Sequence, residues 1–313
     1  MSNPLFDTSK SLLQSIEHPL LIDHGIKLFI KRDDLIHEHV SGNKWRKLKF
    51  NLLDAKHNKR DGIVTFGGAF SNHLVASAFA AKSSGLKSVG IVRGEELSKD
   101  SNETLMKCSE LGMELVFVPR TEYSLKNEKF YKEQLALDYP NHSIIPEGGA
   151  NYFGMIGCQE ILAEIKIDFD EIYVAQGTTT TSAGLTIGLN ENQKINVVPV
   201  LKGFHSIDEM TGLFKQSILE ESFYLEQLEN VVVHSEGHFG GYGKYTSELL
   251  EFIQFFYREF AIKLDPIYTG KVMCYFWSLL KSGKVKNKTI VFIHTGGLQG
   301  SKGIAEKSGI KLY

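Results

Sequence analysis

The sequence has few cysteines, no excess of either charge and no long apolar run. Its three cysteines are widely spaced among 313 residues, which excludes a disulfide framework and a Cys-x-x-Cys metal site and fits a reducing cytoplasm. A formal net charge of −2 gives no electrostatic footprint for nucleic acid or for an anionic membrane surface. No apolar segment approaches the ~20 residues of a membrane-spanning helix. We therefore expect a cytoplasmic protein without a secretory signal, a nucleic-acid partner or a membrane partner.

The stretch from residue 41 to 44, Ser-Gly-Asn-Lys, has the composition of a helix start. Short polar side chains there can accept the unpaired backbone N–H groups of a first turn. Apolar residues then recur at helical spacing, which predicts a helix that ends near Asn58; they are Trp45, Leu48, Leu52 and Ala55.

Lys44 lies in the first turn of this predicted helix, where the positive end of the helix dipole disfavours a cation. A lysine that is pushed toward its neutral amine can attack a carbonyl and form an imine. The alternative is a solvated lysine on a basic helix, because Arg46, Lys47 and Lys49 are close in sequence. This stretch alone favours the solvated lysine.

Apolar, strand-like segments alternate with helical patterns along the whole chain. This alternation predicts an α/β protein with open parallel sheets that carry helices on both faces. No Pro/Ser-rich linker divides the sequence, so a second domain would be an insertion. The expected strands are 26–31, 63–66, 88–92, 114–118, 144–145, 171–175, 196–201, 231–234 and 289–294. The expected helices are 43–58, 74–84, 103–111, 126–139, 155–166, 213–227, 249–260 and 272–280.

Four polar or glycine-rich loops follow apolar strands, at residues 67–72, 148–151, 176–184 and 295–300. Ligands of open parallel sheets bind beyond the carboxyl ends of the strands, so four such loops suggest one enclosed ligand. The loop at 177–182, Gly-Thr-Thr-Thr-Thr-Ser, can offer backbone N–H groups and five hydroxyls to a phosphate. Because it lacks a P-loop lysine and GxGxxG spacing, a single phosphate fits best. The alternative is a capped, threonine-rich turn.

A phosphate loop together with an imine-forming lysine is typical of a pyridoxal 5′-phosphate enzyme. The chain resembles the 1-aminocyclopropane-1-carboxylate deaminase/D-cysteine desulfhydrase family, which belongs to the tryptophan-synthase-β-like (type II) pyridoxal-phosphate enzymes. The matching segments occur in the family's order at 31–34 (KRDD), 41–44 (SGNK), 67–73 (GGAFSNH), 146–149 (PEGG), 241–243 (GYG), 264–271 (LDPIYTGK) and 294–297 (HTGG).

The resemblance implies catalytic roles for four residues. Lys44 would hold the cofactor covalently and later move protons, and Ser71 would act beside the substrate as an acid/base or nucleophile. Tyr242 and Tyr268 would face the substrate, which is expected to be a small amino acid.

The resemblance also implies which residues bind the cofactor. Asn72 would hydrogen-bond its phenolic oxygen, Thr295 would approach its ring nitrogen, and Thr269 would border the same pocket. The phosphate would lie on the hydroxyl-rich loop, which consists of Gly177, Thr178, Thr179, Thr180, Thr181 and Ser182. No metal is expected, since the sequence His37-Glu38-His39 lacks a third ligand and reads as a solvated turn.

The implied architecture has two domains with the active site in the cleft. Residues 1–47 and 152–313 would form a larger cofactor-binding domain, and 48–151 a smaller inserted α/β domain. We also expect a homodimer.

Two positions bear on the reaction. The family's deaminases tend to carry Glu at position 269 and Gln at position 70, where this chain has Thr269 and Phe70. A carboxylate near the ring nitrogen favours a stronger electron sink, which ring opening of a cyclopropane needs more than loss of a thiol does. The favoured activity is therefore conversion of D-cysteine to pyruvate, ammonia and hydrogen sulfide. The alternatives are deamination of 1-aminocyclopropane-1-carboxylate to 2-oxobutyrate, and a cofactor-binding protein without turnover.

Overall fold

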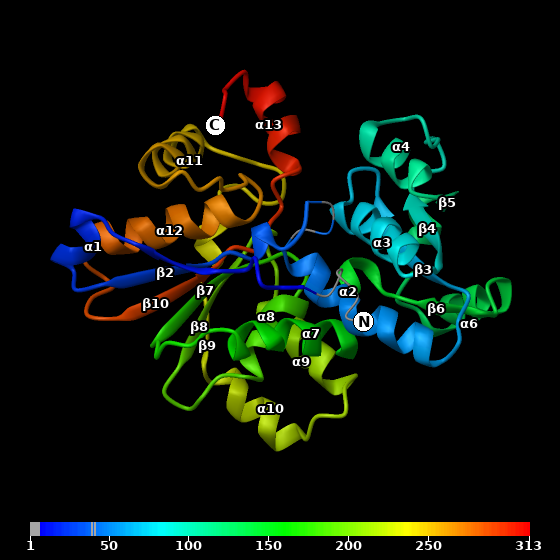
Figure 1. Cartoon of the computed structure of the whole chain (residues 1–313), viewed down its shortest axis with the longest axis horizontal. Helices are drawn as coiled ribbons and strands as arrows, with labels where there is room; N and C mark the ends of the chain where they lie inside the picture. Colours follow the sequence, from blue (N-terminus) through cyan, green and yellow to red (C-terminus); the bar gives the residue numbers. More distant parts are fainter. Residues whose placement is uncertain (1–6, 39, 41) are drawn as a thin grey trace. The chain divides into compact units, whose positions relative to one another are not determined.

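A computed structural model describes residues 7–38, 40 and 42–313 (Figure 1). Ser41 of the Ser-Gly-Asn-Lys motif and His39 of the His-Glu-His sequence lie outside the described residues. The described chain divides into two compact units. The larger unit contains Thr8–Ile36, residues 42–43 and Cys158–Tyr313, and the smaller unit runs chiefly from Lys44 to Gly157. The expected inserted domain, 48–151, falls within the smaller unit, and its boundaries as a functional domain stay a prediction.

The larger unit is built on a six-stranded sheet with the order β1-β2-β10-β7-β8-β9. All its neighbouring strands are parallel except β1, which pairs antiparallel with β2 at one edge. The sequence did not predict β1. The strands are β1 (Leu13–Ile16), β2 (Lys27–Lys31), β7 (Glu171–Gln176), β8 (Lys194–Pro199), β9 (Val231–Val233) and β10 (Thr289–Ile293).

Helices cover both faces of this sheet (Figure 1). Along β7, Ile172 and Val174 pack in a core with residues of α7 (Tyr152–Ala163) and α8, whereas Tyr173 and Ala175 pack with α11 and α12. This alternation is the side-chain period of a strand that is buried on both sides. The helices are α1 (Pro19–Asp23), α8 (Thr180–Thr186), α9 (Ser206–Lys215), α10 (Glu221–Leu228), α11 (Ser247–Phe260), α12 (Thr269–Lys281) and α13 (Gly300–Ser308), with short 3₁₀ turns at η2 (Asp33–Leu35) and η4 (Ser235–His238).

The smaller unit has a four-stranded, fully parallel sheet with the order β5-β4-β3-β6. Residues of α3 and α4 form the core on one face, and residues of α5 and α6 form it on the other. The elements are β3 (Gly62–Gly68), α3 (Asn72–Ser83), β4 (Lys87–Arg93), α4 (Glu103–Glu110), β5 (Met113–Val118), α5 (Arg120–Tyr123), α6 (Lys129–Asp138), β6 (His142–Ile144) and η3 (Glu147–Gly149). Two helices, α2 (Asn43–His57) and α7 (Tyr152–Ala163), contribute residues to both units.

The prediction of one helix over 213–227 is wrong. Helix α9 ends at Lys215 and α10 begins at Glu221. Between them, the Ser217 hydroxyl donates to Phe214 O at 2.6 Å and accepts from Leu219 N at 3.2 Å. Such local side-chain bonds satisfy backbone groups in a turn and so compete with a continuous helix.

Among the described residues, no helix combines the length and the apolar character that crossing a bilayer requires.

Candidate active site

The start of α2 is anchored by the two loops that were predicted to hold the phosphate and the ring nitrogen. The Asn43 side chain donates to Thr181 Oγ1 at 2.8 Å, and its backbone N–H donates to Thr295 O at 3.3 Å. Gly42 has φ of 63°, and a Cβ added there would lie 2.0 Å from Thr295 O, so only glycine allows this approach. All four residues belong to the larger unit. Lys44 follows directly, with its Cα about 3.8 Å from that of Asn43.

The hydroxyls of the threonine-rich loop differ in their partners. Ser182 Oγ donates to Thr179 O at 2.8 Å and accepts from Gln176 Nε2 at 2.9 Å. The Thr181 hydroxyl accepts from Asn43. Thr180 Oγ1, in the first residue of α8, is buried and has no hydrogen-bond partner. A buried hydroxyl without a partner is uncommon in native proteins, and this one is suited to an anionic oxygen of a ligand.

Tyr268 and Tyr242 lie against each other in the larger unit. Their ring centroids are 6.1 Å apart in an edge-to-face arrangement, and the Tyr268 hydroxyl is 3.5 Å from the Tyr242 hydroxyl. The Tyr268 ring also packs at Gly177, where an added Cβ would lie 2.8 Å from Cε1. The structure therefore brings the two predicted substrate tyrosines to the start of the threonine-rich loop.

Thr269 is fully buried and its hydroxyl is used in the start of α12. It donates to Asp265 Oδ1 at 2.7 Å and accepts from Asp265 N at 3.0 Å. The Asp265 carboxylate also accepts the N–H groups of Ile267, Tyr268 and Thr269. Burial raises the pKa of Asp265, and these hydrogen bonds oppose the rise.

Asp265 was not predicted as a site residue, although an Asp before a proline is a turn signal that the sequence does display. The predicted place of Thr269 at the edge of the cofactor pocket stays a prediction.

In the smaller unit, β3 leads into Ser71 and Asn72 at the start of α3. Ser71 caps the helix by accepting the Leu74 N–H at 3.4 Å, and Asn72 is its first residue. Phe70, immediately before the cap, is 77% exposed. Ser71, Asn72 and Phe70 thus lie beyond the carboxyl end of a parallel strand, where ligands of such sheets bind.

His73 is a buried residue beside this cap that was given no role from the sequence. Thr65 Oγ1 donates to Ile145 O at 2.9 Å and lies 2.8 Å from His73 Nε2, so Nε2 carries the proton of this second bond. Nδ1 is buried without a hydrogen-bond partner. Burial, reinforced by the Lys44 and Lys47 cations, lowers the pKa of His73 to about 3. His73 is therefore a neutral imidazole at physiological pH, within electrostatic range of Lys44.

Among the described residues, no group of three His, Cys, Asp or Glu side chains could hold a metal ion. The His37 ring packs on Phe79 with centroids 4.8 Å apart, and its Nδ1 accepts the Val40 N–H at 3.3 Å. His37 is thus engaged in packing and in a turn.

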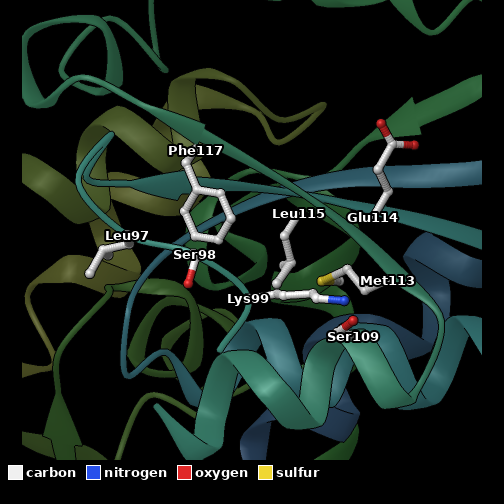
Figure 2. A pocket seen from close by; sticks show the side chains of 8 residues that line it. All are labelled: Leu97, Ser98, Lys99, Ser109, Met113, Glu114, Leu115 and Phe117. Atoms are coloured by element: carbon white, nitrogen blue, oxygen red, sulfur yellow. The ribbon is translucent and has the colours of Figure 1, made fainter. Parts of the chain in front are cut away.

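A shallow pocket of about 390 Å³ lies beside β5 in the smaller unit (Figure 2). None of the predicted site residues lines it. Its lining combines β5 with the end of α4 and the loop before that helix, and consists of Leu97, Ser98, Lys99, Ser109, Met113, Glu114, Leu115 and Phe117.

Comparison with known proteins identifies the family. The profile of the family described as "Pyridoxal-phosphate dependent enzyme" matches residues 16–296. A "Putative 1-aminocyclopropane-1-carboxylate deaminase" from Pyrococcus horikoshii is 34% identical over 287 residues, which cover 88% of this chain and 86% of the relative. A "Bifunctional D-cysteine desulfhydrase/1-aminocyclopropane-1-carboxylate deaminase, mitochondrial" from Arabidopsis thaliana is 31% identical over 304 residues, covering 89% and 74%.

A solved structure described as an "ACC deaminase homologue" has a TM-score of 0.77 and 28% identity, and the match covers 95% of this chain and 92% of that one. The two-unit α/β fold is thus the type II fold that the resemblance implied. Both that resemblance and the pyridoxal-phosphate cofactor are confirmed. The chain belongs to the pyridoxal-phosphate dependent enzymes, within their 1-aminocyclopropane-1-carboxylate deaminase/D-cysteine desulfhydrase family.

Proposed function

We propose that this enzyme catalyses β-elimination from a small D-amino acid, with D-cysteine as the favoured substrate and pyruvate, ammonia and hydrogen sulfide as products. The observation that carries the choice of reaction is the state of Thr269. This residue supplies no carboxylate, and the one proton of its hydroxyl is donated to Asp265 at 2.7 Å. It therefore cannot provide the counter-charge that strengthens the ring as an electron sink. Loss of a thiol after removal of the α-proton is the less demanding reaction.

The residues of the larger unit fit the cofactor's phosphate. The Thr180 hydroxyl has no hydrogen-bond acceptor in the protein. Gly177 has no side chain, and a Cβ at this position would collide with the Tyr268 ring. Backbone N–H groups at the start of α8 add donors for an anion. Asn43, the residue before Lys44, binds this loop through Thr181 Oγ1, and its backbone N–H donates to the Thr295 carbonyl.

The chain's own residues have distinct roles in this proposal. Bound pyridoxal phosphate supplies an electron sink for the bonds at the substrate's α-carbon. Lys44 holds the cofactor and carries the α-proton, and Ser71 shares proton transfer beside it. Tyr242 and Tyr268 offer hydroxyl groups to the substrate. The neutral state of His73 adds no positive charge beside Lys44 and Lys47.

The second candidate is deamination of 1-aminocyclopropane-1-carboxylate to 2-oxobutyrate and ammonia. The names of the relatives favour it, because the Pyrococcus horikoshii protein carries only this activity in its name and the Arabidopsis thaliana protein carries both. The two candidates differ in product, so they are separated by one experiment.

The experiment supplies purified holoenzyme with D-cysteine, L-cysteine or 1-aminocyclopropane-1-carboxylate and measures sulfide, pyruvate and 2-oxobutyrate. We expect sulfide and pyruvate from D-cysteine in equal amounts, and little 2-oxobutyrate. The Lys44→Ala protein is the control for cofactor-dependent turnover, since free pyridoxal phosphate reacts with cysteine. Efficient 2-oxobutyrate formation without sulfide release would replace the first candidate by the second. Absence of every product would favour a cofactor-binding protein without turnover.

A further inference from the structure

Lys271 is a fully buried lysine that no part of the proposed reaction uses. It is the third residue of α12, which begins immediately after Tyr268. Its Nζ donates to Gly241 O at 2.6 Å and to His238 O at 2.8 Å. Both carbonyls lie just before Tyr242 in the chain, one immediately before the loop 239–243 and one within it. One ammonium group therefore joins the helix that follows Tyr268 to the loop that carries Tyr242.

The loop held by Lys271, residues 239–243, contains no helix or strand. Phe239, Gly240, Gly241 and Gly243 all have positive φ, from 47° to 105°. Glycines lose the most conformational entropy when they become ordered. With three glycines in five residues, this loop therefore has a high entropic cost of ordering. Its internal hydrogen bonds include the turn bonds from Gly241 N to His238 O at 3.0 Å and from Lys244 N to Gly241 O at 3.1 Å. The Gly240 N–H also donates to His238 Nδ1 at 2.9 Å.

The position of Lys271 is unfavourable for a cation by itself. It lies in the first turn of a helix, where the dipole opposes a positive charge, and its side chain is removed from solvent. Burial lowers the pKa of Lys271 to about 8, with the Asp265 carboxylate acting in the opposite direction. An apolar side chain of similar length would avoid this penalty. The two carbonyl contacts are what the lysine provides in return.

We propose that Lys271 is a positioning residue for the reaction: it clamps the 239–243 loop so that the Tyr242 hydroxyl stays beside the Tyr268 hydroxyl on the substrate side. The substrate part of this inference rests on the proposed function, in which both tyrosines face the substrate. Without the clamp, the loop remains attached at its ends but Tyr242 samples several positions. Substrate binding and turnover are then impaired, while the Thr180 hydroxyl and the bond from Asn43 to Thr181 are untouched.

The test replaces Lys271 by Met, which keeps the length of the side chain but has no donor. Lys281→Met is the matched control, because Lys281 is exposed in the last turn of the same helix. We expect kcat/KM of Lys271→Met to fall about tenfold to a hundredfold, the usual effect of misplacing a group near the reacting atoms, with the cofactor absorbance band retained. Lys271→Gln keeps a neutral donor, so its kcat/KM should lie between those of Lys271→Met and the wild type. It serves as the informative variant if Lys271→Met does not fold.

A double-mutant cycle with Tyr242→Phe identifies the path of the effect. If Lys271 acts through Tyr242, removal of the Tyr242 hydroxyl costs much less in the Lys271→Met protein than in the wild type. Equal losses in the two backgrounds would overturn the proposal, as would a Lys271→Met enzyme within twofold of wild-type kcat/KM.

A measurement without turnover separates this inference from the proposed function. Fluorotyrosine placed at position 242 should give one narrow ¹⁹F resonance in wild type and in Lys281→Met. In Lys271→Met and Lys271→Gln the resonance should broaden or split. An unchanged resonance in folded Lys271 variants would overturn the clamp. A wild type inactive on every amino acid tested would refute the proposed function, and the ¹⁹F comparison would still decide the clamp.

Discussion

Replacing His73 by Gln should remove a large part of the acid sensitivity of this protein. In the folded chain the pKa of His73 is lowered from 6.5 to about 3, chiefly by burial. The unfolded chain takes up a proton at this residue below about pH 6.5, whereas the folded chain does not until about pH 3. His73 therefore does not change the free energy of unfolding above pH 6.5. As the pH falls from 6.5 toward 3, protonation of His73 in the unfolded chain lowers this free energy.

The size of the effect follows from the same two values. Each pH unit across this window corresponds to about 1.4 kcal/mol, so the change from pH 7 to pH 5 lowers the free energy of unfolding by about 2 kcal/mol. That is a substantial share of the ~5–15 kcal/mol by which proteins are stable. Gln is the chosen replacement because its amide can still donate to Thr65 Oγ1, as His73 Nε2 does.

The assay is urea denaturation of the holoenzyme at pH 7 and pH 5, followed by circular dichroism. Wild type and His57→Gln, which changes an exposed histidine on α2, should lose about 2 kcal/mol more between the two pH values than His73→Gln does. An equal loss in His73→Gln and wild type would refute the conclusion that His73 is neutral and buried in the folded protein.

Three further substitutions test the site. Ser71→Ala should lower kcat by ~10²–10⁴, with cofactor absorbance unchanged; a loss below tenfold in a rate assay would reduce Ser71 to its role as a helix cap. Thr180→Val should weaken cofactor retention in dialysis by about tenfold to a hundredfold, since a hydrogen bond to a charged group contributes about 1.5–3 kcal/mol. The control is Thr186→Val, because the Thr186 hydroxyl already donates to Ser182 O in the same helix; this variant should retain cofactor. Equal loss of cofactor from both variants would mean that the phosphate binds elsewhere. Asn43→Ala should release cofactor more readily than Asn58→Ala at the other end of α2; equal off-rates would contradict the anchor.

The sequence predicts the alternation of strands and helices well because apolar runs and helical spacing are local signals. The strand expected at 171–175 is β7, Glu171–Gln176, and the helix expected at 43–58 is α2, Asn43–His57. The error at 213–227 arises where the apolar pattern continues through a turn that Ser217 stabilises. Pattern alone does not register a side chain that satisfies the backbone in place of the helix.

The candidate site was predictable as a set of motifs, but its internal bonds were not. The residue type at position 269 predicted a neutral neighbour of the cofactor. The bond from the Thr269 hydroxyl to Asp265, however, depends on how the start of α12 folds back on the preceding turn. The clamp at Lys271 joins segments 30 and 33 residues apart, and one sequence contains no local signal for such a contact. Likewise, the motif contained His73, but only burial reveals that this imidazole is neutral.

The assignment of the active site depends above all on which lysine holds the cofactor. Borohydride reduction of the purified holoenzyme fixes pyridoxal phosphate permanently to that lysine, and peptide mass spectrometry then locates it. We expect the modification on Lys44 alone, with the neighbouring Lys47 and Lys49 unmodified. Modification of Lys47, Lys49 or Lys271 in place of Lys44 would contradict the assignment of the active site.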